Sequence, residues 1–515
     1  MVDAIVVDST AVDSTVVDDQ TAVDDQTITL ALVSHTNVGK TTLARTLLRR
    51  DVGQVLDQAH VTEVSTPYSL ITRGTSELIL SDTPGFGDSA RLLKRLRQHE
   101  RPLVWFFQQL WDRATDRPLW CGQQAALTVR HDADVVLYLV NAAEEPEEAG
   151  YVAPELELLS WIGRPILLLL NQTGGSAGST ERLAQRIDRW RRHAERWPLV
   201  RGVLSLDAFS RCWVEERVLL DAVEEVLPED RQPVMAGLSE AWMERHMQVF
   251  ERSMGAMARH LASTAIDRIP LPETGASSGL SGKGKAARKK AMEELAERLE
   301  ASVGELTRTL LELHGLEGGV VEDFEQELDA FQIRGELIEP DRGALLGSAV
   351  SGAMGGLAAD LMAGGLTFGG GVLAGAILGA LGGAGLARGY QLLKGEKPSV
   401  GWTPDFLDAY THQVLLRYLM VAHFGRGRGE LRHWLKPERW HADLTSALRQ
   451  RQDERLQVWR RAPKADRVDS VAEDLAPLLR SAVARVLVDQ YPHAHWLLAG
   501  DPPRRDTDPE SWADG

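Results

Sequence analysis

Residues 30–47, LALVSHTNVGKTTLARTL, are the most informative part of the sequence about the fold. It starts with an apolar run typical of a buried strand and ends with helix-forming residues. Between them, S-H-T-N-V-G-K-T matches the pattern G-x-x-x-x-G-K-[ST], with Ser34 in place of the first glycine. In such a strand–loop–helix unit, backbone N–H groups and the helix N-terminus surround phosphate groups. The sequence therefore predicts a phosphate-binding loop whose nucleotide-binding residues are Asn37, Val38, Gly39, Lys40, Thr41 and Thr42.

A second motif, SDTPG at residues 81–85, follows the apolar run ELIL. Asp82 at a strand end can hold the ligand shell of Mg²⁺, and Gly85 lets its N–H approach a γ-phosphate because it has no side chain. From the first motif, Lys40 supplies charge to the β- and γ-phosphates, and Thr41 offers its hydroxyl to the same Mg²⁺. The order and spacing of the two motifs predict a nucleotide switch with Lys40 and Gly85 among its catalytic residues.

Five short apolar runs alternate with helix-length segments over residues 28–230, namely LALV, ELIL, DVVLYLV, PILLLL and VRGVLSL. Continuous apolar strands of this kind indicate a mostly parallel sheet with helices on both faces. After Pro228 strand-like runs become scarce, and leucines such as Leu295 and Leu299 recur at helical spacing. We therefore expect an α/β domain followed by an all-α region.

Composition restricts the class of protein. The 515 residues are 43% hydrophobic, so the chain is neither wholly disordered nor collagen-like. Cys121 and Cys212 are too few for a disulfide scaffold, and no basic-then-apolar signal peptide opens the sequence. We therefore expect a reducing, cytoplasmic environment. A net charge of −17 argues against broad coating of nucleic acid, although a local basic patch could still bind RNA.

The most unusual stretch is residues 343–387, in which Asp360 is the single charged residue. Its glycines recur at four-residue spacing, which stacks them on one helix face and lets two backbones approach closely. The pattern predicts a tight helical hairpin with a glycine zipper. Two interpretations stay open: a membrane element with both ends cytoplasmic, or a hairpin buried in a larger helical domain. The length of the uncharged chain favours membrane contact through residues 343–388.

The run SHTNVGKTTL followed by DTPGF resembles the Era-like and tRNA-modification branch of the TRAFAC class of P-loop GTPases, over about residues 28–230. The resemblance implies a domain that binds and hydrolyses GTP with Mg²⁺, using a switch threonine that binds the metal and takes part in catalysis. By spacing this residue is Thr62, with Thr66 as the alternative. The whole-chain arrangement resembles a bacterial GTPase family whose C-terminal domain has no assigned function.

In that family the motif N-K-x-D, placed after a buried strand, recognises guanine. Here Asn171 and Gln172 occupy its first two positions, but Gly174 stands where the aspartate should accept hydrogen bonds from the base. Loss of that acceptor should relax the selectivity for GTP over ATP. We hypothesise that Asp207, after the next strand, compensates. Asp207→Ala should then weaken GTP binding more than ATP binding.

The resemblance also bears on hydrolysis. Phe86 follows Gly85 where many GTPases carry a water-positioning glutamine. Relatives with asparagine at the position of Asn37 use it to hold a K⁺ that supplements transition-state charge, often on dimerisation. We therefore expect slow basal hydrolysis that K⁺ stimulates, and a homodimer through the GTPase domain. Equal rates in K⁺ and Na⁺ would remove Asn37 from the mechanism.

We divide the chain into a disordered acidic tail (1–27), an Era-like GTPase domain (28–230), a helical region (231–335), a glycine-zipper hairpin (336–398) and a C-terminal helical region with a disordered end (399–515). The expected function is a GTP-hydrolysing switch coupled to the hairpin, cytoplasmic or attached to the cytoplasmic side of the inner membrane. Two alternatives stay open: an RNA-, ribosome- or tRNA-directed GTPase, and a nucleotide-binding membrane-interaction protein without turnover.

Overall fold

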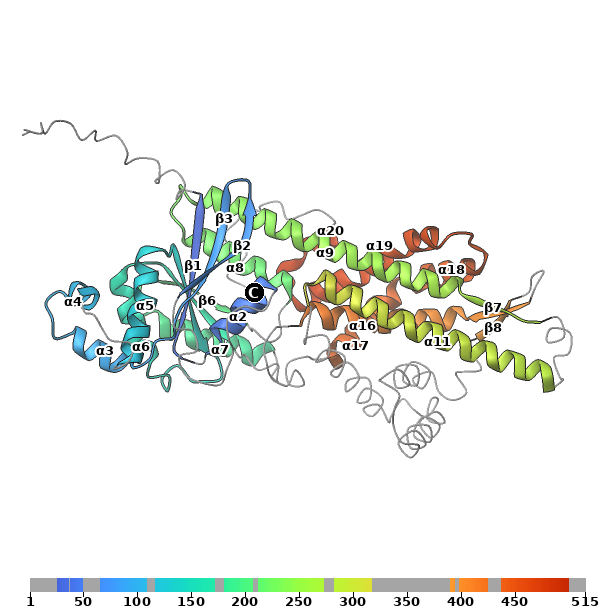
Figure 1. The fold of residues 1–515 in the computed structure, drawn as a ribbon, viewed down its shortest axis with the longest axis horizontal. Helices are drawn as coiled ribbons and strands as arrows, with labels where there is room; N and C mark the ends of the chain where they lie inside the picture. Colours follow the sequence, from blue (N-terminus) through green and yellow to red (C-terminus); the bar gives the residue numbers. More distant parts are fainter. Residues whose placement is uncertain are drawn as a thin grey trace, which may run out of the picture.

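The computed structural model describes ten segments of the chain: residues 26–36, 38–49, 65–108, 116–171, 180–206, 212–272, 282–316, 390–393, 398–424 and 437–499. Figure 1 shows a sheet-containing part at one end of an elongated molecule and a bundle of long helices at the other. The expected tail up to residue 25 and the glycine-rich stretch 343–387 lie outside the described residues.

A six-stranded sheet forms the α/β part. Its strands are β1 (Thr27–Ser34), β2 (Thr66–Arg73), β3 (Ser76–Asp82), β4 (Val135–Asn141), β5 (Ile166–Asn171) and β6 (Val200–Ser205). Their order is β2-β3-β1-β4-β5-β6, with all pairs parallel except β2 with β3. Every predicted apolar run lies in a parallel strand, which confirms the α/β class. The edge strand β2 was not predicted, because its residues TPYSLITR are mostly exposed and form no continuous apolar run.

Helices cover both faces of the sheet because alternate strand residues point to opposite sides. Leu30 and Leu32 pack into the core under α2 (Lys40–Leu48) and α8 (Trp213–Val226). Ala31 and Val33 pack into the core on the other face. The helices on that face are α3 (Ser89–Leu96), α4 (Pro102–Gln108), α5 (Arg117–His131), α6 (Val152–Ile162) and α7 (Thr180–Ala194).

The remaining part is helical, as predicted. Its helices are α9 (Gln232–Ile266), α11 (Gly282–Leu313), α16 (Pro404–Ala422), α17 (Pro437–Gln450), α18 (Gln452–Arg461), α19 (Val468–Gln490) and α20 (Trp496–Ala499), with short 3₁₀ turns η2 (Ala462–Lys464) and η3 (Pro492–Ala494). The leucines at helical spacing lie on α11, where Leu295 and Leu299 are buried. A small antiparallel sheet of β7 (Arg268–Pro270), β9 (Ser399–Trp402) and β8 (Tyr390–Leu393) was not apparent in the sequence. Its strands have only three or four residues each.

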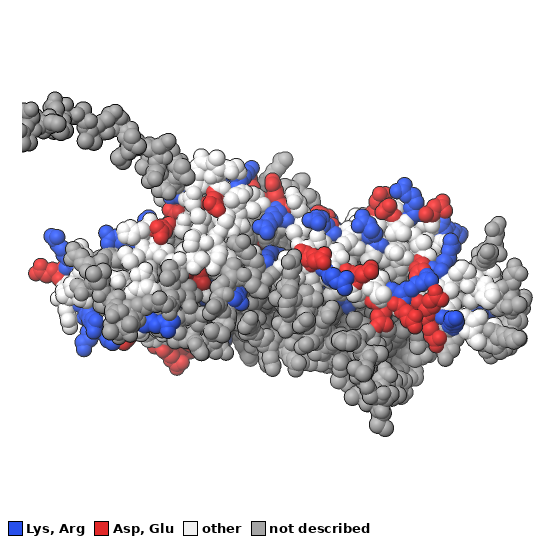
Figure 2. All heavy atoms as spheres, viewed as in Figure 1, with Lys and Arg blue, Asp and Glu red and all other residues white. Residues whose placement is uncertain are grey.

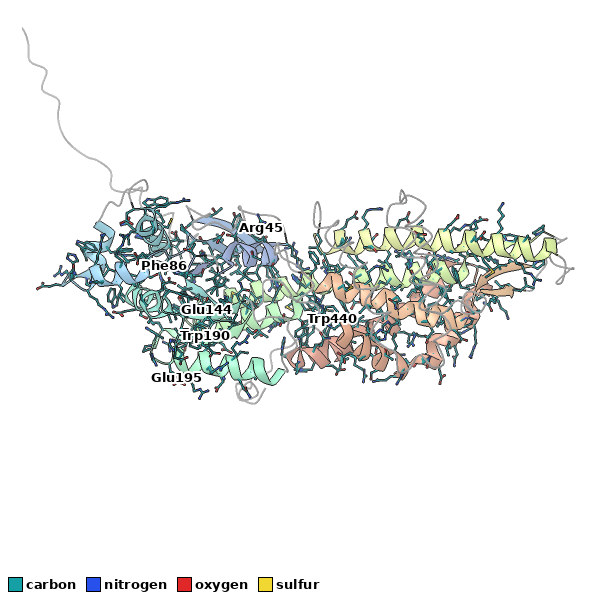
Figure 3. The ribbon with its side chains drawn as sticks, turned by 90° about the horizontal axis from the view of Figure 1, so that it is seen from below. Arg45, Phe86, Glu144, Trp190, Glu195 and Trp440 are labelled. Carbon is teal, nitrogen blue, oxygen red and sulfur yellow. The ribbon has the colours of Figure 1, made fainter. Side chains whose placement is uncertain are left out.

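One apolar core joins the two parts. It runs from the sheet face under α2 and α8 into the helical bundle, where α9 contributes Trp242 and Phe250. On the surface, Arg73 of β2 donates to the Gly237 carbonyl at 2.8 Å and to Glu240 at 2.6 Å. Figure 3 shows Trp440 of α17 at the end of the helical part that faces the α/β part. Among the described helices, none combines the length and the apolarity needed to cross a membrane.

Candidate nucleotide-binding site

The phosphate loop is a tight turn between β1 and α2. Gly39 takes a left-handed conformation at φ +102°, and α2 begins at the next residue, Lys40. A Cβ atom at Gly39 would lie 2.7 Å from Asn171 Nδ2, so both the backbone and the neighbour require glycine. The local sequence thus builds the strand–loop–helix unit that the motif predicts.

Lys40 folds back over this loop. Its side chain is 7% exposed, and Nζ donates to the Ser34 hydroxyl at 3.0 Å. Ser34, which replaces the usual glycine, therefore supplies an oxygen that holds the ammonium group above the turn. Burial lowers the pKa of Lys40, and the carboxylates of Asp82 and Glu155 oppose that effect. The result is a buried amine donor, shielded from water, at the place where the motif predicts phosphate oxygens.

Thr41 and Asp82 meet beside Lys40. The Thr41 hydroxyl donates to Asp82 Oδ2 at 2.8 Å, and Asp82 is 2% exposed. Burial raises the pKa of Asp82, whereas Lys40 and the hydrogen bond from Thr41 lower it. The second oxygen, Oδ1, is buried and has no hydrogen-bond partner among the described residues. A buried carboxylate oxygen of this kind next to a threonine hydroxyl fits Mg²⁺, which binds through one or two protein oxygens together with phosphates and water.

No group of three His, Cys, Asp or Glu side chains in the described segments is arranged to hold a metal by itself.

The segment Gly85–Phe86 runs alongside the loop. Phe86 N–H donates to the Ser34 carbonyl at 3.0 Å, and the Thr36 N–H and hydroxyl donate to the Phe86 carbonyl at 3.2 and 2.9 Å. A Cβ at Gly85 would lie 3.1 Å from Thr36 Cα and 3.2 Å from Lys40 Nζ. The sequence placed Gly85 near Lys40, and the structure brings them together. Glycine is needed there because two backbones and an ammonium group converge.

Phe86 itself turns away from the loop. Its side chain is 1% exposed and packs into the core over Gly122 of α5, where a Cβ would lie 3.3 Å from the ring (Figure 3). An aromatic segment around Trp105 lies in α4. In α4, Phe106 is fully buried, whereas Trp105 is only partly buried and stacks on His99. The described part of the segment therefore contributes to the core.

Asn171 supports the loop from β5. Its side chain is fully buried, and Nδ2 donates to the Val38 carbonyl at 2.8 Å. The bond fixes the backbone of the loop from the position at which the sequence predicts base recognition. Thr42 is buried within α2, and Thr66 lies opposite Asp82 in the register of β2 and β3. The other predicted site residues, Asn37, Thr62, Gln172 and Asp207, lie outside the described residues.

Two residues near the loop were missed by sequence reasoning. Glu155 of α6 is fully buried and contacts His35, and Arg49 at the end of α2 contacts His314. A glutamate in the apolar helix sequence VAPELELLSWI is a weak signal of a buried polar contact. No local pattern marks Arg49, because its partners are distant in the sequence.

The sheet order, the phosphate loop and the DTPG segment beside Lys40 define a P-loop GTPase domain. A family model described as 50S ribosome-binding GTPase matches residues 29–172. A second model, described as a domain of unknown function (DUF3482), matches residues 199–481, more than half of the chain, and this protein belongs to that family.

Several solved structures resemble part of the chain. Era from Aquifex aeolicus bound to GDP and aluminium fluoride is 18% identical, and the match covers 40% of this chain and 58% of Era at a TM-score of 0.30. Era in complex with MgGDPNP and a segment of 16S ribosomal RNA gives the same values. A variant of SsGBP is 16% identical over 39% of this chain and 56% of its own, at a TM-score of 0.25. Likeness of this degree does not bear on function. No curated protein matches the chain.

Proposed function

We propose that this protein is a Mg²⁺-dependent GTP-hydrolysing switch whose nucleotide state is transmitted to its helical region. One observation carries the proposal: Lys40, the pair Thr41–Asp82 and Gly85 converge on one side of the phosphate loop. In this arrangement Lys40 would bind the β- and γ-phosphates, and Thr41 and Asp82 would hold Mg²⁺. The backbone N–H of Gly85 would bind the γ-phosphate. The metal, when bound, neutralises charge that develops on the phosphate oxygens.

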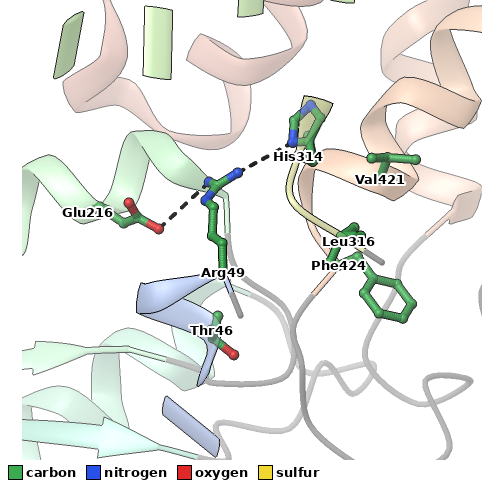
Figure 4. A pocket seen from close by; sticks show the side chains of 8 residues that line it. Thr46, Arg49, Glu216, His314, Leu316, Val421 and Phe424 are labelled. Atoms are coloured by element: carbon green, nitrogen blue, oxygen red, sulfur yellow. Dashed lines mark hydrogen bonds and ion pairs between the residues drawn. The ribbon is translucent and has the colours of Figure 1, made fainter. Parts of the chain in front are cut away.

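The end of the phosphate-loop helix supports the transmission step. Arg49 caps α2 with a left-handed backbone at φ 52°. Its guanidinium lies 3.4 Å from His314 Nδ1, just past α11, and 3.9 Å from a Glu216 oxygen on α8 (Figure 4). A Cβ at Gly315 would lie 3.1 Å from the Arg49 carbonyl. Arg49 thus sits in a junction between α2, α8 and the end of α11.

Glu216 ties this junction to α9. It is 2% exposed, accepts from Trp242 Nε1 at 2.7 Å and lies 2.9 Å from His246 Nε2. Buried polar groups that satisfy one another resist small displacements, because breaking one bond leaves a partner unpaired. One end of α2 carries Lys40 and the other end carries Arg49, so a shift of α2 on phosphate binding reaches the helical region directly.

Calorimetric titration with GTP and ATP, with and without Mg²⁺, together with phosphate release, tests the enzymatic part. We expect GTP binding that requires Mg²⁺ and is lost on Lys40→Ala by more than about tenfold, because a buried charged donor is removed. Lys290→Ala, an exposed lysine on α11, serves as the matched control and should bind normally. Equal affinity in the wild type and Lys40→Ala would reject the site.

Hydrogen exchange of the helical region in the GDP-bound and GTP-analogue-bound states tests the transmission. We expect a nucleotide-dependent difference at the end of α11 and in α16 that Arg49→Ala reduces. Arg73→Ala removes an exposed contact between β2 and α9 instead, so it should keep the difference. A wild-type protein whose helical region exchanges identically in both states would rule out the transmission.

A ribosome-directed GTPase is the second candidate, favoured by the description of the family matched over residues 29–172. On the face shown in Figure 2, acidic and basic side chains alternate along the helical part, and the net charge is −17. Co-sedimentation with 50S subunits in the GTP-analogue state tests this alternative. Membrane contact through residues 343–388 and K⁺ stimulation through Asn37 concern residues outside those described and stay predictions. The homodimer through the GTPase domain also stays a prediction. Carbonate extraction of membranes and rates in K⁺ against Na⁺ test two of them.

A further inference from the structure

A single buried carboxylate connects the phosphate loop to the segment that follows Gly85. Glu155 of α6 is fully buried. Its Oε1 lies 2.8 Å from His35 Nδ1 and accepts from the Ser89 hydroxyl at 2.6 Å, and its Oε2 accepts from the Tyr138 hydroxyl at 2.8 Å. Three donors from three separate elements thus meet at one side chain.

The three donors differ in how firmly they are held. Tyr138 lies in the middle of β4, fully buried between β1 and β5, so it anchors Glu155 to the sheet. His35 is the second residue of the phosphate loop, and its ring also stacks on Tyr151 at 4.5 Å. Ser89 is the first residue of α3 and lies four residues after Gly85. The carboxylate therefore joins a fixed strand and the loop to a segment that carries Gly85.

Packing alone does not explain a glutamate at this position. Burial of a carboxylate is unfavourable unless hydrogen bonds compensate it, and an apolar residue of similar volume would fill the same space. Glu157, two residues along the same helix, shows the ordinary role: it is partly exposed and pairs with Arg97 on the surface at 2.5 Å. Fully satisfied buried polar groups define one geometry among their partners. Here the partners are the loop and the start of α3.

We propose that Glu155 is a positioning residue for GTP hydrolysis, which holds Ser89, and through it Gly85, at a fixed place relative to the phosphate loop. The inference rests on the proposed function. Loss of the Ser89 hydroxyl removes the bond from the start of α3 and leaves the bonds from His35 and Tyr138 in place. The contact between Ser89 and Glu155 is therefore the one of the three that couples the segment after Gly85 to the loop.

Single-turnover GTP hydrolysis and GDP affinity in the full-length protein test this proposal. Ser89→Ala removes one hydroxyl and keeps the buried carboxylate of Glu155 together with its electrostatic effect on Lys40. Glu155→Gln keeps the volume but loses the negative charge and replaces one of the two acceptor oxygens by an NH₂ donor. We expect each variant to lower the hydrolysis rate by about ten- to a hundredfold, the range for a hydrogen bond to a charged group, and to change GDP affinity by less than about threefold. Glu157→Gln should match the wild type.

The double variant Ser89→Ala with Glu155→Gln should lose less than the sum of the two single losses, because both changes act on the same contact. Additive losses, or a loss of GDP affinity as large as the loss of rate, would overturn the proposal and indicate a merely structural role. Ser89→Ala decides the question if Glu155→Gln unfolds. Hydrolysis that is unchanged in Ser89→Ala overturns this inference alone, whereas a wild type without hydrolysis overturns the proposed function as well.

Discussion

Acidification should destabilise the helical region through three buried histidines. His314, His423 and His412 are 3%, 1% and 9% exposed. Burial lowers the pKa of His314 to about 3 and those of His423 and His412 to about 4, from an ordinary value of 6.5. Arg49 and His423 further lower the pKa of His314, and His441 further lowers that of His412. All three rings are therefore neutral in the folded protein at neutral pH.

Proton linkage gives the direction in which stability changes with pH. The unfolded chain takes up a proton at each ring near pH 6.5, whereas the folded protein does so only near pH 3–4. The stability that the three neutral rings contribute is therefore complete above pH 6.5. It is lost as the pH falls towards the pKa values of the rings in the folded protein. At pH 5.5 each histidine costs slightly more than about 1 kcal/mol, or about 4 kcal/mol for the three, out of roughly 5–15 kcal/mol for a typical domain. Protonation of His314 would also place a second positive charge 3.4 Å from the Arg49 guanidinium.

Urea unfolding followed by circular dichroism at pH 7.5, 6.5 and 5.5 measures this loss. Asp82 and Glu300, whose pKa values are raised by burial, act in the opposite direction, so the histidine contribution is best taken as a difference between proteins. His423→Gln should be less stable at pH 7.5, because the ring bond to the Leu419 carbonyl at 2.7 Å is lost. It should also lose about 1 kcal/mol less stability than the wild type between pH 7.5 and 5.5. Parallel pH profiles for the two proteins would show that His423 does not contribute to the loss.

Two further predictions concern the loop. Gly85→Ala should slow GTP hydrolysis while the protein stays folded. The new Cβ would lie 3.1 Å from Thr36 Cα and must push two backbones apart by a few tenths of an ångström. Phosphate release measures the rate, and an unchanged rate would contradict this prediction. Asn171→Ala should weaken GDP binding by about 5–150-fold, equivalent to roughly 1–3 kcal/mol, because the buried Val38 carbonyl loses its donor. Calorimetry decides between this result and unaltered affinity.

The geometry of the loop around Lys40 could be predicted because its residues are contiguous in the chain. Gly39, Lys40 and Thr41 are neighbours in the chain, and the backbone of a strand–turn–helix unit fixes their arrangement wherever it occurs. Asp82 and Gly85 were predictable as well, because parallel strands of one sheet end at the same edge. The edge strand β2 was missed because it buries little apolar surface, and the periodicity of apolar residues is the principal signal of a strand.

The α/β class, the loop around Lys40 and the helical nature of the second part could be read from the sequence, because each depends on residues close together in the chain. The contacts that surround them became visible in the folded protein alone. Glu155 lies 120 residues from His35, and His314 lies 265 residues from Arg49. Neither pair has a local pattern, since a buried polar contact is stable only when packing supplies both partners and excludes water.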